Sequence, residues 1–304
     1  MKFLITGALS NPYECIEKIK ELNHSVVFMQ NEFDELPCKP TEIEGVVCNA
    51  LFIYHSIDKF RNLKYIQLTS AGLDRVPIDY VKQNNICLHN ARGVYSIPMA
   101  EFALSGVLQL YKQSVFFARN QDKHLWIKNR DLLELNSKTV SIVGYGNVGI
   151  ECAKRFKAFD TTILAVDIIK PSDEYYDKYF CIEDIKQALS ISDVVVVTMP
   201  LTEKTRGLFD KEIFKNIKKG AVLVNVARGA LINENDLILA LNEKRIYGAV
   251  LDVFEEEPLE NNSLLWDMEN VIITPHNSFV GENNSPRLKN IILTNLRNYK
   301  NNES

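Results

Sequence analysis

Short apolar runs alternate with amphipathic segments along the first third of this 304-residue chain. The runs are rich in β-branched residues, which favours buried strands, whereas the segments between several of them have helical spacing. This alternation predicts a small domain built on a parallel sheet. The expected strands cover 2–6, 25–29, 45–49, 65–69 and 86–89, and the helical patterns include 12–22 and 57–62.

The longest stretch with helical spacing covers residues 97–120. Ser96 is a candidate N-cap, and Pro98 falls within the first turn, where a missing N–H is tolerated. Because the stretch is apolar on more than one face, three interpretations stay open. It is an ordinary core helix, a helix that links two domains, or a helix packed against a second subunit.

A second strand–helix alternation starts at residue 140, and it predicts a doubly wound nucleotide-binding domain. An amphipathic helix over 286–300 then returns to the first domain, and we expect the polar end 301–304 to fray. The six expected strands cover 140–143, 163–166, 194–198, 221–226, 248–251 and 271–274.

The two alternations together predict an α/β protein with two domains. Residues 1–96 and 283–304 form a flavodoxin-like domain, and residues 97–282 form an inserted doubly wound (Rossmann) domain.

A G-x-G-x-x-G pattern follows the first strand of the second domain. Gly144 allows a tight turn, Gly146 lets the backbone approach a pyrophosphate, and Gly149 lets the following helix pack close to the strand. Asp167 ends the next apolar run, at the spacing expected for a carboxylate that binds a ribose hydroxyl. Its negative charge opposes the 2′-phosphate of NADP and so favours NAD, although Lys170 leaves some room for NADP.

Three polar residues lie just beyond strands of the second domain, at the sheet edge where α/β proteins bind ligands. Reduction of a carbonyl by hydride needs a fixed cation and a proton donor. Arg228 supplies the cation, His276 donates the proton, and Glu257 orients the imidazole and stabilises its charged form. Taken singly, each residue has an ordinary alternative: a surface ion pair for Arg228, a solvated acid for Glu257 and a loop residue for His276.

Five sequence blocks closely resemble the signature blocks of the NAD-dependent D-isomer-specific 2-hydroxyacid dehydrogenases. The resemblance extends from the Thr-Ser-Ala-Gly-Leu-Asp run at 69–74 to His276, and the order of the blocks is highly specific. The blocks are Gly-Tyr-Gly-Asn-Val-Gly (144–149), Met-Pro-Leu-Thr (199–202), Asn-Val-Ala-Arg-Gly (225–229), Asp-Val-Phe (252–254) with Glu-Pro (257–258), and Pro-His (275–276).

The resemblance implies an enzyme that interconverts a 2-oxoacid and a D-2-hydroxyacid, with NAD as cofactor. Arg228 then binds and polarises the substrate, His276 is the acid/base and Glu257 supports it. The Ser70-Ala71-Gly72 turn is expected to bind the substrate carboxylate through backbone N–H groups. The implied cofactor contacts are Gly144, Gly146, Asn147, Val148, Gly149, Asp167, Met199, Pro200, Val226, Ala227, Arg228, Asp252 and His276.

Two stretches depart from the usual pattern or bear on the substrate. The family usually has a small residue such as alanine or glycine after the histidine and then a threonine, whereas the run here is Asn-Ser-Phe-Val-Gly (277–281). Bulk at Phe279 changes the shape beside the nicotinamide. The apolar loop 50–55 favours an apolar rather than a phosphorylated substrate side chain if it lines the pocket. A core position for Leu51 and Phe52 is equally consistent with the sequence.

Three rival functions use a similar fold. A non-enzymatic NAD(H)-sensing regulatory protein needs the nucleotide site but not Arg228, Glu257 and His276 together. An S-adenosylmethionine methyltransferase has no role for the later blocks. A formate-type dehydrogenase of the same family typically pairs its histidine with glutamine rather than glutamate.

Composition changes this picture little. The chain is 46% hydrophobic, has a net charge of −4 and lacks a basic stripe, so nothing favours nucleic acid or a membrane as a partner. The six cysteines show no metal-ligand spacing and are expected to be buried free thiols, which fits a cytoplasmic protein. The family resemblance further implies a homodimer, with 97–120 as the natural contact, and we expect no appended regulatory domain.

Overall fold

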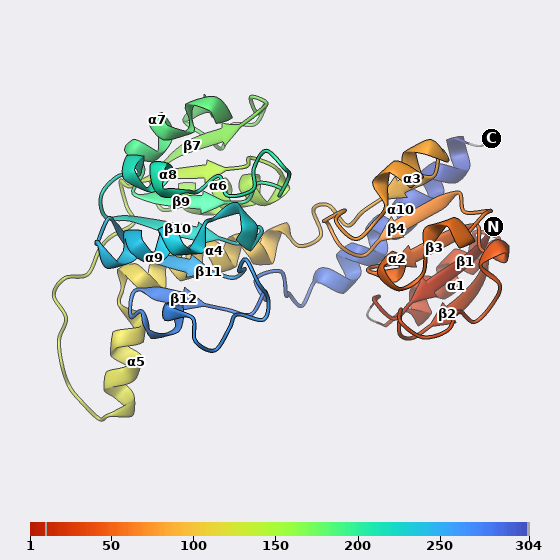
Figure 1. Cartoon of the computed structure of the whole chain (residues 1–304), viewed down its shortest axis with the longest axis horizontal. Coiled ribbons are helices and arrows are strands. Elements are labelled where there is room, and N and C mark those ends of the chain that lie inside the picture. Colours follow the sequence, from red (N-terminus) through yellow and green to blue (C-terminus); the bar gives the residue numbers. More distant parts are fainter. Residues whose placement is uncertain (10, 303–304) are drawn as a thin grey trace. The chain divides into compact units, whose positions relative to one another are not determined.

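The computed structural model describes residues 1–9 and 11–302, and the chain divides into two compact units (Figure 1). Unit 1 contains Met1–Tyr95 and Gly281–Ser304, and unit 2 contains Ser96–Val280. Each unit has its own parallel sheet covered by helices. The predicted two-domain α/β class is therefore confirmed.

Unit 1 has a five-stranded parallel sheet in the order β2-β1-β3-β4-β5, which is the flavodoxin-like order. All five predicted strands are present, and each ends within a residue of its expected bounds. The strands are β1 (Lys2–Thr6), β2 (Ser25–Met29), β3 (Gly45–Cys48), β4 (Tyr65–Leu68) and β5 (Cys87–His89). The helices are α1 (Tyr13–Glu21), α2 (Leu51–Tyr54), α3 (Ile78–Gln83) and α10 (Asn284–Asn302), with 3-10 turns η1 (Pro40–Glu42) and η2 (Ile57–Lys59).

The helix expected over 57–62 is wrong, because only the short η2 turn forms there. The helix in this part of the chain is α2, whose Leu51 and Phe52 are buried in the core. Of the two interpretations that the sequence leaves open for these residues, the structure supports a place in the core of unit 1.

The C-terminal helix α10 packs within unit 1, as the sequence predicts. Its residues Leu288, Ile292 and Leu296 are buried together with Phe3 and Ile5 of strand β1. The helix continues through Asn302, residues 303–304 lie outside the described part of the chain, and the expected fraying of 301–304 stays a prediction.

Unit 2 has a seven-stranded parallel sheet in the order β12-β11-β10-β9-β6-β7-β8, which is a doubly wound arrangement. The prediction of six strands is wrong because it missed β8. This strand lies at the edge of the sheet, where it pairs with β7, and of its four residues Phe180 alone is buried. The strands are β6 (Thr139–Val143), β7 (Thr162–Asp167), β8 (Lys178–Cys181), β9 (Val194–Val197), β10 (Ala221–Asn225), β11 (Ile246–Leu251) and β12 (Val271–Ile273).

The predicted continuous helix over 97–120 is instead two helices. The chain breaks at Gln113, whose φ of 53° is left-handed and whose Nε2 donates a 2.6 Å hydrogen bond to the Tyr247 hydroxyl. Ser96 is the first residue of the first helix rather than a cap. The helices of unit 2 are α4 (Ser96–Tyr111), α5 (Ser114–Asp122), α6 (Asn147–Lys157), α7 (Ile185–Ser190), α8 (Lys211–Asn216) and α9 (Glu234–Asn242), with turns η3 (Ile182–Asp184), η4 (Gly229–Leu231) and η5 (Leu264–Asp267).

The two halves of that stretch differ in burial. Helix α4 is embedded in the core of unit 2, where Ala103, Val107 and Leu110 are buried. Helix α5 has no buried residue and projects from the rest of unit 2, and the segment after it arcs away from the sheet (Figure 1). Only α4 therefore fits the interpretation of an ordinary core helix.

The expectation of buried free cysteines is met only in part. All six cysteines are free, but only Cys15, Cys48 and Cys152 are buried. Across residues 1–9 and 11–302, none of the helices combines the length and the apolar character that crossing a bilayer requires.

Candidate active site

Each glycine in the turn between β6 and α6 has a different structural role. Gly144 has a φ of 93°, and a Cβ there would lie 2.3 Å from the backbone nitrogen of Met199. A Cβ on Gly149 would lie 2.5 Å from the carbonyl oxygen of Gly144. By contrast, a Cβ on Gly146 would have no neighbour within 4 Å, so this face of the turn is open to a ligand.

Asp167 ends β7 beside this turn. Its Oδ2 accepts a 2.6 Å hydrogen bond from the backbone N–H of Tyr145, and its Oδ1 accepts one of 2.7 Å from Ile168. The Tyr145 side chain is buried and its hydroxyl donates to Asp173, and burial with the nearby Asp173 charge raises the pKa of Tyr145. The carboxylate and the glycine turn are thus held together at one sheet edge.

Strands β10, β11 and β12 are neighbours and run parallel, so the loops that follow them leave the same edge of the sheet (Figure 1). Asn225 ends β10 and is fully buried. Its side chain accepts from the Ala227 N–H at 3.1 Å and donates to the Arg228 carbonyl at 3.0 Å, which fixes the backbone that carries Arg228. Arg228 Nη1 donates to the Ala227 carbonyl at 2.8 Å, and its side chain is partly exposed.

The loops after β10 and β11 are packed without space between their backbones. A Cβ on Gly229 would lie 1.8 Å from the carbonyl carbon of Phe254, so this position needs glycine. Glu234 and Glu255 also cap each other's backbone N–H groups at 2.9 and 2.5 Å. Burial, with the neighbouring charges of Glu255 and Glu256, raises the pKa of Glu234. These contacts fix the two loops relative to each other.

His276 and Glu257 form a hydrogen-bonded pair. The distance between His276 Nδ1 and Glu257 Oε2 is 2.8 Å, and Oε1 of the same carboxylate accepts from the Phe254 N–H at 3.2 Å. Both side chains are more than one-third exposed, so the imidazole is accessible to a ligand. With Nδ1 bonded to the carboxylate, Nε2 is the ring atom left for a substrate. The ordinary alternative for Glu257, a solvated acid without a specific contact, is not what the structure shows.

A fully buried carboxylate supports the loop that carries His276. Asp252 accepts hydrogen bonds from the Thr274 hydroxyl at 2.6 Å and from the N–H groups of Asn277 and Ser278 at 2.7 and 2.9 Å. The N–H of His276 donates to the Asp252 carbonyl at 2.8 Å. This loop turns sharply, because His276 has a φ of 51°. Asp252 therefore holds the histidine in an otherwise unfavourable backbone conformation.

Phe279, the unusual residue after the histidine, lies beside it. The ring centroids of His276 and Phe279 are 6.0 Å apart with an interplanar angle of 83°, an edge-to-face contact. Phe279 is 40% exposed, so it forms part of the surface next to the imidazole.

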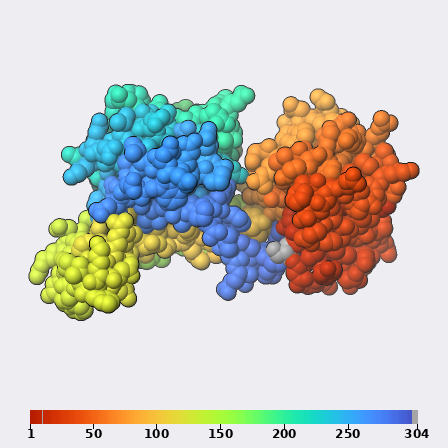
Figure 2. All heavy atoms as spheres, turned by 60° about the horizontal axis from the view of Figure 1, so that its bottom comes forward, coloured from red at the N-terminus to blue at the C-terminus, as the bar shows by residue number. Residues whose placement is uncertain are grey.

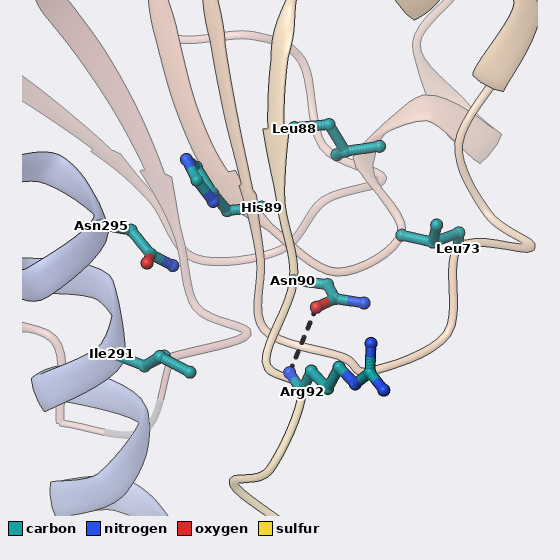
Figure 3. Close-up of a pocket in the computed structure, with 7 residues that line it drawn as sticks. All are labelled: Leu73, Leu88, His89, Asn90, Arg92, Ile291 and Asn295. Carbon is teal, nitrogen blue, oxygen red and sulfur yellow. Dashed lines mark hydrogen bonds between the residues drawn. The ribbon is translucent and has the colours of Figure 1, made fainter. Parts of the chain in front are cut away.

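In unit 1, the Ser70-Ala71-Gly72 turn follows β4. Asn90 donates a 2.6 Å hydrogen bond to the Ala71 carbonyl and accepts one from the Arg92 N–H, and Figure 3 shows this second bond beside the turn. Within the described residues, the N–H groups of Ala71 and Gly72 donate no hydrogen bond. They are therefore available to an anion.

Comparison with known proteins identifies the chain. Residues 104–278 match the model of the D-isomer specific 2-hydroxyacid dehydrogenase NAD-binding domain. The chain belongs to this family. The D-lactate dehydrogenase of Staphylococcus aureus is 30% identical over 245 residues, which are 76% of this chain and 73% of that protein.

Other members of the dehydrogenase family are longer. The D-3-phosphoglycerate dehydrogenase of Archaeoglobus fulgidus is 33% identical over 221 residues, which cover 72% of this chain but 42% of that protein. Among solved structures, a D-isomer specific 2-hydroxyacid dehydrogenase family protein from Aeromonas salmonicida has a TM-score of 0.85 and 29% identity, with 99% and 96% of the two chains covered. The relatives carry different substrate names, so membership alone does not select a substrate.

Unit 2 is the NAD-binding domain of this family, and its residues fit the cofactor. The face at Gly146 is open at the start of α6, and the unpaired N–H groups of a helix start favour a negative charge such as that of a pyrophosphate. Asn147 and Val148 are the first residues of that helix, and the backbone of Met199 lies against Gly144. Pro200, Val226 and Ala227 follow β9 and β10 at the same edge.

Sequence reasoning missed several residues that build the site. In the sequence, Asn225 is only part of a signature block and Thr274 only the end of a strand, yet both hold the loops of catalytic candidates. A polar residue inside an apolar run is the feature that marks such positions, because a buried polar group needs partners.

Proposed function

We propose that this protein is an NAD-dependent oxidoreductase that interconverts a 2-oxoacid and a D-2-hydroxyacid. The observation that carries the proposal is the His276–Glu257 pair, joined at 2.8 Å at the sheet edge where the loop of Arg228 also leaves. A nucleotide-sensing protein needs no such pair. Bound NADH supplies the hydride that adds to the C2 carbonyl carbon.

The roles of the side chains follow from their charge and position. The guanidinium of Arg228 is a cation with a planar set of donors, so it stabilises the developing oxyanion and binds the substrate carboxylate. His276 donates a proton from Nε2 to the carbonyl oxygen, and the negative Glu257 stabilises the imidazolium that precedes this step. The N–H groups of the 70–72 turn bind the substrate carboxylate. In the direction of oxidation, His276 accepts the hydroxyl proton instead.

Asp252 acts on this chemistry through the backbone. Its carboxylate is fully buried and saturated with internal donors, so it positions the His276 loop beside the nicotinamide. The ring of Phe279 occupies space next to the imidazole and so restricts which 2-oxoacids fit.

The direct test is a panel of 2-oxoacids with the purified protein and NADH. We expect loss of NADH absorbance with at least one of them, and chiral chromatography of the product should show the D-hydroxyacid. The nucleotide-sensing alternative would be favoured if the protein bound NADH but neither reduced any 2-oxoacid nor oxidised any D-2-hydroxyacid with NAD.

We also propose that the protein forms a homodimer through α5 and the segment after it. Within the part of the chain that the structure describes, α5 has no buried residue, and Trp126 is 96% exposed. Together with Phe117, Leu125 and Ile127 it lines a hollow in this arm, which protrudes as a lobe in Figure 2. A second copy of the chain would remove this apolar surface from water. The contact expected from sequence, 97–120, thus narrows to its second half and extends to residue 127.

The dimer is tested by light scattering on the purified protein. We expect a mass of two chains, and Trp126→Ala should shift the population towards one chain at low concentration. A monomeric wild-type protein would contradict the proposal.

The six free cysteines support the expectation of a reducing, cytoplasmic compartment.

A further inference from the structure

A single carboxylate ties together three segments at the carboxyl edge of the unit 1 sheet. Glu32, which follows β2, accepts hydrogen bonds from the Thr6 hydroxyl at 2.7 Å and from the N–H groups of Asn49 and Ala50 at 2.7 and 2.6 Å. Its own carbonyl bonds His55 Nε2 at 2.9 Å. Thr6 ends β1 and Asn49 follows β3, so the carboxylate crosslinks the segments after β2, β1 and β3.

The segments held by Glu32 carry three exposed apolar side chains. Phe33 is 66% exposed, Ile53 60% and Tyr54 55%, and the rings of Phe33 and Tyr54 make an edge-to-face contact with centroids 6.1 Å apart. The opposite face of α2, with Leu51 and Phe52, is buried in the core. The core of unit 1 therefore accounts for one face of α2 and leaves the other unexplained. We call Phe33, Ile53 and Tyr54 the apolar wall.

The sheet order places the α2 segment next to the 70–72 turn. Strands β3 and β4 are parallel neighbours, so the α2 segment after β3 and the 70–72 turn after β4 leave the same edge of the sheet. That edge is where α/β sheets bind ligands. A small molecule whose carboxylate binds the 70–72 turn presents the rest of its carbon chain to the neighbouring segment.

We infer that Glu32 is a positioning residue for substrate selection, because it holds the apolar wall against the side chain of the 2-oxoacid. This inference rests on the proposed function and adds the substrate class: 2-oxoacids with an apolar side chain of several carbons. A phosphorylated side chain would have no cation in the wall to pair with. Glu32 contacts neither the reacting atoms nor the cofactor in this scheme, and it acts through the backbone of Asn49 and Ala50.

A carboxylate suits this task because it only accepts hydrogen bonds. Glutamine keeps the shape of the side chain but turns one acceptor into an NH₂ donor, which would face a backbone N–H or the Thr6 hydroxyl. Glu32→Gln is therefore expected to release the start of α2 with little change in volume. Thr6→Val removes one of the three donors and leaves the other two in place.

The experiment compares two substrates with the full chain and NADH. One is 4-methyl-2-oxopentanoate, which has a branched apolar side chain, and the other is glyoxylate, which has none. Glu32→Gln should lower kcat/KM for 4-methyl-2-oxopentanoate about tenfold, mainly through a higher KM, while kcat with glyoxylate stays within about twofold of wild type. Tyr54→Ala should change the same ratio, and Thr6→Val should change it less.

Glu35→Gln is the matched control, since Glu35 lies in the same segment, is exposed and makes no hydrogen bond or ion pair within the described residues. It should behave as wild type. Equal loss with both substrates would show that Glu32 is merely structural, and an unchanged ratio in folded Glu32→Gln and Tyr54→Ala would show that the wall does not meet the substrate. Either result overturns the inference while the proposed function stands. If wild type reduces no 2-oxoacid, the proposed function itself fails and this inference fails with it.

Discussion

At the carboxyl edge of each sheet, one carboxylate fixes a loop by accepting hydrogen bonds from a threonine hydroxyl and two backbone N–H groups. In unit 2, Asp252 accepts from one threonine hydroxyl and two backbone N–H groups, and in unit 1 Glu32 does the same. Asp252 is fully buried, whereas Glu32 is partly exposed. The first carboxylate fixes a loop that carries a titratable side chain, and the second fixes a loop that carries apolar side chains.

Combined with the proposed function and the proposed role of Glu32, this difference predicts that unit 2 carries the catalytic residues and unit 1 recognises the substrate side chain. Under the proposed function the histidine needs one backbone geometry, and unit 2 provides it with the buried polar network around Asp252. Recognition of a side chain needs shape and apolar area, which unit 1 provides on a short helix at its surface. Variants in unit 2 should therefore change whether the reaction occurs, and variants in unit 1 should change which substrate is used.

The largest effect should come from removing the imidazole. His276→Ala loses general acid catalysis, which contributes roughly 10²- to 10⁴-fold to the rate. We expect a loss of kcat of that order with every 2-oxoacid, measured by NADH absorbance, while NADH binding measured by fluorescence persists. Tyr54→Ala in unit 1 is the counterpart and should retain kcat with glyoxylate.

Glu257→Gln keeps a hydrogen-bond partner for His276 but removes the charge that stabilises the imidazolium. Its activity should fall between that of wild type and His276→Ala. If His276→Ala were as active as wild type, the proposed roles at the unit 2 edge would be wrong.

The next effect concerns the cofactor. Hydrogen bonds to a charged group contribute about 1.5–3 kcal/mol, which is roughly 10- to 100-fold in affinity. Asp167→Asn should weaken NAD binding by up to this amount and narrow the preference for NAD over NADP, because the charge that repels a 2′-phosphate is gone. Calorimetric titration with both cofactors measures this, and unchanged discrimination would contradict the ribose contact.

The unit 2 edge was predictable from sequence because each of its constraints restricts residue type. These constraints are the positive φ at Gly144, the packing at Gly149 and the chemistry of His276 with Glu257. The pairing of those last two side chains, 2.8 Å apart, was expected from strand order and the family resemblance together. The roles assigned to them stay predictions.

The unit 1 edge was predicted only in outline. The strands were correct because buried β-branched runs determine them, but α2 was missed because a four-residue helix has too few positions to show a period. Glu32 was not predicted at all, since its partners are a hydroxyl and two backbone N–H groups that leave no pattern in the sequence. The break at Gln113 was missed for a similar reason, because its partner Tyr247 is far away in the chain.

A smaller effect distinguishes two roles of glycine within unit 2, close packing at Gly149 and an open face at Gly146. Gly149→Ala places a Cβ 2.5 Å from a backbone oxygen, and overpacking of this kind costs about 1–3 kcal/mol of folding free energy. Gly146→Ala meets no neighbour in the protein, so its melting temperature should match wild type while its NADH affinity falls. Thermal denaturation and NADH titration of both variants measure the two effects. Equal loss of stability in both would mean that the face at Gly146 is not a ligand surface.

The smallest expected effect is the sharpest comparison, because the two units offer matched threonines. Thr274→Val and Thr6→Val each remove one hydroxyl donor from a carboxylate and keep the shape of the side chain, at a cost of about 0.5–1.5 kcal/mol each. Thr274→Val loosens the loop of His276, so it should lower kcat by a few fold with glyoxylate and 4-methyl-2-oxopentanoate alike. Thr6→Val loosens the wall, so it should raise KM for 4-methyl-2-oxopentanoate only. If both variants gave the same kinetic pattern, the two carboxylates would serve folding in general, and the division between catalysis in unit 2 and recognition in unit 1 would be lost.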